Sequence, residues 1–269
     1  LGEDYQPVIF RVVDDAELFS PSSFIFDDEV GYRGSAQFNM SHKFGIEAIY
    51  TRLHDEFNDE VEVEDGVVPD VEPMELRAAG IIINSPTETF DMHYWTKFQS
   101  AELNAKYYFD YWNTAIFTGF RWVELDERFS GGITNTPPPL IVETQNQLLG
   151  MQIGIESQHW IGYGVLRLDS SLRGGMFYNT AQQRPQLDMV SAGDSDRDYA
   201  WVGESEIALT MPVNRNASFR VGYRLIHLSG VALAADQINV TDLSVPVADV
   251  YQDAQTIYHG WSIGFEAWR

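Results

Sequence analysis

The side chains best suited to chemistry in this sequence are arginines and carboxylates at alternating positions. In residues 218–228, Arg220 and Arg224 fall on even positions, while the odd positions from 219 to 225 carry apolar or aromatic residues. Successive side chains of a β-strand point to opposite faces, so a strand here has one charged face and one apolar face. Such a charged row can form ion pairs, steer ions or exchange protons.

Catalytic and zinc-binding arrangements are missing from the pattern. No G-x-S-x-G motif occurs, and the chain has no cysteine. Glu204 and Glu206 could serve as an acid and a base, but arginines on other strands favour salt bridges instead. We therefore expect no enzymatic activity. The histidines show no spacing of two or four residues that would favour zinc: they are His42, His54, His93, His159, His227 and His259.

The same alternation recurs along the chain, with charges of both signs on the faces opposite the apolar rows. Because these signs are nearly balanced, the net charge of −23 comes mainly from the connections. Balanced ion pairs fill a narrow barrel, whereas charges of one sign would steer solutes through it. The predicted lumen-facing charged residues are Arg33, Glu47, Arg77, Glu102, Lys106, Arg121, Glu156, Arg167, Asp169, Arg173, Glu204, Glu206, Arg220, Arg224 and Glu266.

These strands predict an all-β fold: a single antiparallel up-and-down transmembrane β-barrel of about ten strands, within a range of roughly 8–12. Connections alternate between short (110–113, 157–162, 212–216) and long (126–142, 179–198, 229–255), which is typical of short periplasmic turns and long outer loops. A soluble β-sandwich would also alternate, with its apolar face buried against a second sheet. The expected strands cover residues 31–40, 44–51, 75–83, 100–110, 114–125, 143–156, 163–178, 199–211, 218–228 and 257–268.

Two segments differ from the barrel pattern. Residues 1–28 form an N-terminal arm or extra strand ahead of a barrel over residues 29–269, and this arm either packs on its own barrel or pairs with a neighbour's edge. Residues 54–73 hold nine acids and neither Lys nor Arg. They predict a solvated loop, or a Ca²⁺ or Mg²⁺ site, although no EF-hand pattern occurs. The candidate metal ligands are Asp55, Asp59, Glu62, Glu64 and Asp65.

Five short motifs stand out along the chain: GFRWVELDE at residues 119–127, NQLLGMQIG at 146–154, GYR at 222–224 followed by GVALAADQ at 230–237, DDEVGYR at 27–33 and FGIE at 44–47. These motifs resemble the β-barrel porin family of planctomycete outer membranes. Ala235 stands where that family usually has Pro. The resemblance implies an outer-membrane barrel and brings no catalytic or ligand-binding residues with it.

Two functions remain open from the sequence. The first is porin-like passage of small solutes through a narrow charged lumen. The second is a non-conducting structural or surface-assembly barrel that oligomerises through its loops or the N-terminal arm. Both predict the bacterial outer membrane of a Gram-negative type cell as the location, the lipid bilayer as a partner, and a homo-oligomer or surface lattice as an assembly. The acidic surface argues against nucleic acid, and no cofactor is expected beyond the cation of the acidic loop.

Overall fold

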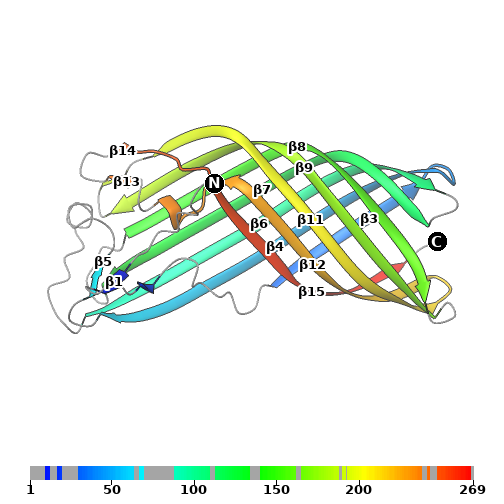
Figure 1. The fold of residues 1–269 in the computed structure, drawn as a ribbon, viewed down its shortest axis with the longest axis horizontal. Coiled ribbons are helices and arrows are strands. Elements are labelled where there is room, and N and C mark those ends of the chain that lie inside the picture. The colour runs from blue at the N-terminus through cyan, green and yellow to red at the C-terminus, as the bar shows by residue number, and fades with distance from the viewer. Residues whose placement is uncertain are drawn as a thin grey trace.

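Nine long strands form one antiparallel up-and-down sheet, shown in Figure 1. Each strand pairs with the next along the chain, in the order β3-β4-β6-β7-β8-β9-β11-β12-β15. The strands are β3 (Val30–Asn39), β4 (Phe44–Val63), β6 (Glu88–Phe109), β7 (Thr114–Ile133), β8 (Leu140–Ile161), β9 (Leu166–Leu187), β11 (Asp194–Asn214), β12 (Ala217–Val231) and β15 (Ala254–Ala267). The computed structural model describes residues 10–12, 17–19, 30–63, 67–69, 88–109, 113–133, 140–161, 165–187, 190–191, 193–237, 241–242 and 247–267.

The sheet curls into a half-barrel whose edge strands are β3 and β15. The strand number is odd, so these two edges run in the same direction. Among the described strands, β3 pairs only with β4, and β15 only with β12. The sequence predicted about ten strands where the structure describes nine. The predicted strand over residues 75–83 lies outside the described residues.

The strands are longer than the alternating pattern predicted, and this corrects the predicted long loops. β7 continues to Ile133 and β8 starts at Leu140, so most of the loop predicted over residues 126–142 is paired strand. β9 and β11 likewise take up most of residues 179–198. At about 3.3 Å per residue, a strand of 22 residues is roughly 70 Å long, well beyond the 9–11 residues that cross a bilayer.

The two faces of the sheet exchange polarity along the strands, which explains why the predicted strands ended early. Near the short turns, Leu103 and Phe120 point outward and are exposed, while Glu102 and Arg121 point inward and are buried. Farther along the strands most charged side chains are outward and most apolar ones inward, with a few buried polar exceptions such as Glu127 and Asn146. The paired row Tyr50, Ala101, Trp122, Leu149, Tyr178 and Tyr199 marks the change across six neighbouring strands.

We call the outward residues between this row and the short turns the outer belt. In β6 it covers Ala101 to Phe109, nine residues, which matches the length of a tilted transmembrane strand. Its members include some of the most exposed apolar side chains of the protein, such as Ile153 at 69% and Ile263 at 73%. Directly beyond the row, Tyr50 donates to Gln99, and both Gln99 and Gln145 donate to Glu124, giving a polar ladder across four strands.

Short strands lie outside the nine-stranded path. In the N-terminal arm, β1 (Phe10–Val12) pairs with β2 (Glu17–Phe19) and with β5 (Val67–Pro69), which belongs to the connection between β4 and β6. β10 (Val190–Ser191) pairs antiparallel with the end of β9, and β13 (Thr241–Asp242) pairs with β14 (Val247–Ala248) in the connection between β12 and β15. Among the described residues, no helix is long and apolar enough to cross a membrane.

Candidate functional site

The inner face of the half-barrel carries a network of ion pairs near the short turns. Of the fifteen charged residues predicted to face inward, Arg77 lies outside the described residues. Each of the other fourteen forms at least one ion pair with another member of the set. We call these fourteen residues the inner network. Several of these pairs, such as Arg33 with Glu204 and Lys106 with Glu156, join strands that are not neighbours in the sheet, so charged side chains meet across the interior.

Glu204 lies at the centre of the inner network. Its carboxylate is 3.0 Å from Nη1 of Arg121, 3.4 Å from Nη1 of Arg33 and 3.5 Å from Nε of Arg224. Only 2% of its side chain is exposed. A carboxylate removed from water this completely is stabilised only by close partners of opposite charge, and these come from β7, β3 and β12.

The rest of the network extends from this centre toward the short turns. Glu206 accepts hydrogen bonds from Nη2 of Arg220 and Nη2 of Arg224, both at 2.8 Å. Glu102 accepts from Nη1 of Arg173 at 2.9 Å. A separate group forms where Lys106 contacts Glu47 at 2.9 Å and Glu156 at 2.8 Å. These contacts tie most strands of the half-barrel together through side chains as well as through the backbone.

The inner network carries no net charge. Its seven cations are Arg33, Lys106, Arg121, Arg167, Arg173, Arg220 and Arg224, and its seven anions are Glu47, Glu102, Glu156, Asp169, Glu204, Glu206 and Glu266. A neutral, internally paired set exerts little long-range field on a passing solute. It acts instead as a cross-linked filling between the strands.

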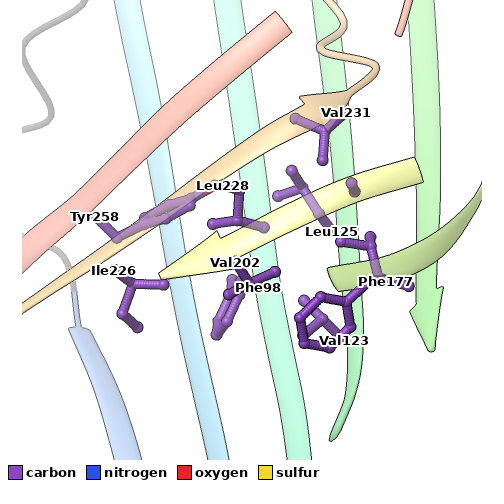
Figure 2. Close-up of a cluster of buried hydrophobic side chains, with 11 residues drawn as sticks. Phe98, Val123, Leu125, Phe177, Val202, Ile226, Leu228, Val231 and Tyr258 are labelled. Carbon is purple, nitrogen blue, oxygen red and sulfur yellow. The ribbon is translucent and has the colours of Figure 1, made fainter. Parts of the chain in front are cut away.

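A layer of apolar side chains crosses the interior next to the inner network, on the side away from the short turns. Figure 2 shows Phe98, Leu125, Phe177 and Leu228 converging from β6, β7, β9 and β12. All four are at most 1% exposed. Because apolar side chains packed at this density leave little room for water, this apolar layer separates the two ends of the interior. Its other members are Val123, Leu148, Ala200, Val202, Ile226, Val231 and Tyr258.

Residues 230–237, which begin with the last two residues of β12, fold into the interior beside the apolar layer; we call them the inserted segment. Asn146 on β8 binds the backbone of Ala232 twice, accepting from its N–H and donating to its carbonyl, both at 2.7 Å. Asn179 on β9 donates to the carbonyl of Gly230 at 3.0 Å. Gly230 has a φ of 76°, a left-handed conformation that suits glycine and turns the chain inward.

Glu127 on β7 holds the middle of the inserted segment. Its Oε2 accepts a hydrogen bond from the N–H of Ala234 at 3.0 Å and from the hydroxyl of Tyr94 at 2.6 Å. Burial raises the pKa of Glu127 to about 7, against the hydrogen bonds that favour its charged form. Burial, and next the charge of Glu127, also raise the pKa of Tyr94 well above its ordinary value.

Polar cavities open on the side of the short turns. One of about 210 Å³ is lined by both edge strands and the inner network, with Ser35 on β3 and Ser262 on β15 among its walls. Another of about 650 Å³ lies near the turns and is lined mainly by amides, hydroxyls and aromatic rings, including Gln37, Asn39 and Tyr108. Glu156 lines both cavities. The described interior therefore has cavities near the short turns, and the apolar layer and the inserted segment occupy it farther along.

The structure corrects the loop predicted over the acidic residues 54–73. Asp55, Asp59 and Glu62 belong to β4, which pairs with β6 up to Val63, so the predicted loop is a strand over residues 54–63. Glu64 and Asp65 lie outside the described residues. Among the side chains that the structure describes, no group of three or more His, Asp or Glu is placed to hold a metal ion.

Sequence reasoning missed the residues that hold the inserted segment: Asn146, Asn179, Glu127 and Tyr94. For Glu127 and Asn179 the signal was present in the alternation, because each lies on the inward parity of a strand between apolar inward neighbours, Leu125 and Phe129 or Phe177 and Ala181. A buried amide or carboxyl among apolar residues needs a partner, and here most of the partners are backbone groups of the inserted segment.

Comparisons with known proteins add no family to this picture. No protein-family model, no curated protein and no solved structure matches the chain.

Proposed function

We propose that this protein is an outer-membrane β-barrel that is closed at rest and serves a structural role in the cell envelope. The observation that carries the proposal is the filling of the interior by three elements in series: the neutral inner network, the apolar layer and the inserted segment. A pore for solutes needs a continuous aqueous path, and the apolar layer interrupts it.

The outer belt supports the membrane part of the proposal. It is apolar, about nine residues tall, and bounded on one side by tyrosine and tryptophan at the row of residues where polarity changes. Aromatic residues favour the interface between water and lipid. Beyond this row the strands have polar outer and apolar inner faces, which suits a barrel wall that stands in water.

A barrel in lipid must satisfy the backbone groups of its edge strands, because no water is there to do so. We propose that β3 and β15 pair in the membrane and that this seam is parallel, since nine strands are an odd number. Arg33 on β3 reaches Glu204 and Glu206 on β11 across the interior, which supports edges that lie close enough to close the barrel.

Passage of small solutes is the second candidate, and the cavities of about 210 and 650 Å³ on the side of the short turns favour it. Conductance of the purified protein in a planar bilayer distinguishes the two functions. A closed structural barrel requires detergent or lipid to stay dispersed and gives no stable single-channel currents. Regular current steps would support passage and refute the closed state, and a monodisperse folded protein in plain buffer would refute the membrane barrel itself.

A further inference from the structure

We infer that the inserted segment is a pH-controlled stopper: it is held in the interior while Glu127 is neutral and is released when Glu127 becomes charged. This inference deepens the proposed function, because the stopper is one of the three elements that close the interior. It rests on the contacts of the segment and on the charges around Glu127.

The barrel wall reaches the inserted segment mainly through hydrogen bonds to its backbone, and the segment's own Gln237 exchanges two hydrogen bonds with the backbone of Tyr251. Asn146, Asn179 and Glu127 provide hydrogen bonds to Ala232, Gly230 and Ala234. Ala232 and Ala234 are fully buried, and Ala235 is 5% exposed. These alanine side chains add little apolar area, so the polar contacts hold the segment together with the packing of Val231 and Leu233 against the apolar layer.

Among the described residues, the side chains that hydrogen-bond the Glu127 carboxyl are hydroxyls, and the nearby Arg128 and Arg184 lie on exposed outward positions. From β6, Tyr94 and Thr96 donate to its carboxyl, and the hydroxyl of Tyr258 on β15 lies 2.9 Å from Oγ1 of Thr96. Asp236 of the inserted segment acts on Glu127 as a like charge. The nearest inward-facing cation on β7 is Arg121, six residues along the strand, or roughly 20 Å away.

The charge of Glu127 is therefore unfavourable in the closed state and favourable in water. Its pKa is about 7 when buried against an ordinary 4.5, and the pKa of Asp236 is raised to about 6 by burial. Both groups bind their protons more tightly in the closed state. Closure is thus strongest below pH 4.5 and weakens as the pH rises through 6 and 7.

The test uses a single cysteine in the full chain, which has none of its own. In detergent micelles, the reaction of Ala235→Cys with a maleimide is compared with that of Ser195→Cys, an exposed position on β11. The ratio of the two rates removes the pH dependence of thiol chemistry. From pH 5 to pH 8 we expect this ratio to rise roughly 50- to 100-fold through Glu127 alone.

Glu127→Gln keeps an acceptor for the N–H of Ala234 but cannot ionise. With this substitution we expect most of the pH dependence of the labelling ratio to disappear. Adding Asp236→Asn should remove the remainder. Asn146→Ala is the control for release, and it should give fast labelling at pH 5 as well. A ratio that is equally low at pH 5 and 8, or an unchanged pH dependence in Glu127→Gln, would overturn the inference.

Hydrogen exchange of the Ala234 amide in the cysteine-free chain covers the case in which Ala235→Cys itself displaces the segment. Protection that is lost between pH 5 and pH 8, after correction for base catalysis, supports the stopper. An unprotected amide at pH 5 rejects it. Neither labelling nor hydrogen exchange depends on conductance. A barrel that conducts at every pH would refute the proposed closed resting state, and the labelling would still show whether the inserted segment is released as the pH rises.

Discussion

Replacing Glu204 with glutamine tests whether the inner network holds the interior together. Glutamine has nearly the same size and keeps an oxygen acceptor, but it removes one negative charge from among Arg33, Arg121 and Arg224. These guanidiniums then share fewer carboxylates in a site where Glu204 is only 2% exposed. Because breaking one partner of a buried ion pair leaves an uncompensated charge, we expect the free energy of unfolding to fall by about 3–5 kcal/mol.

The measurement is urea unfolding in detergent micelles, followed by the fluorescence of the seven tryptophans. Glu143→Gln is the matched control, because Glu143 also pairs with an arginine, Arg128, but at 3.6 Å and with 47% of its side chain exposed. Exposed pairs of this kind contribute at most about 1 kcal/mol. If both substitutions lower the free energy of unfolding by the same amount, the inner network is not a buried cross-link. The proposal of a closed interior would then lose its main argument.

A double-mutant cycle with Arg121→Gln refines the test. Arg121 is 1% exposed and 3.0 Å from Glu204, so its removal alone leaves carboxylates with too few cations. Together, the two substitutions restore neutrality. We expect the double variant to be at least about 1 kcal/mol more stable than the sum of the single effects predicts. Additive effects would show that these two charges do not stabilise one another.

Three further predictions concern the apolar layer, the outer belt and the seam. Phe177→Ala should lower the free energy of unfolding by about 3–5 kcal/mol, because it opens a cavity in the apolar layer, and the same urea titration measures this loss. Ile153→Arg should destabilise the barrel folded in lipid vesicles by about 2–4 kcal/mol, whereas Gln145→Arg, which lies beyond the row where polarity changes, should cost less than about 1 kcal/mol; equal costs would contradict a lipid-facing belt. Ser35→Cys with Ser262→Cys should form a disulfide in the membrane if β3 and β15 pair with one another. The disulfide is detected as a shift in gel mobility that a reductant reverses. If no cross-link forms under oxidation, the barrel is open at this seam.

The assignment of side chains to faces could be predicted from the sequence because the period of a strand is two. Glu102 and Lys106 alternate with Leu103 and Ala105, and this pattern alone predicts which side each one takes. The fourteen described residues of the inner network follow the predicted parity. Which of them pair with one another could not be predicted, since Arg33 on β3 meets Glu204 on β11 only after the sheet has curled.

The ends of the strands could not be predicted, because the rule that relates polarity to faces reverses within one strand. Phe98 points inward while Leu103, on the same strand, points outward. A window that spans this reversal shows no consistent alternation. Residues 126–142 were therefore predicted as loop although β7 and β8 extend well into them. Pro137 to Pro139 strengthened that interpretation, but they lie between the two strands.

The reversal is also the strongest argument against a soluble sandwich. In a sandwich, a second sheet would cover the apolar side of the first, and the inward charges would face water. Here the described residues form one long curled sheet with only short strands beside it, and the side with the inner network is the enclosed one. The exposed apolar belt then needs a cover that the described part of the chain does not provide. In the function that we propose, a bilayer provides this cover over about the height of the belt, and it ends where the outer faces become polar.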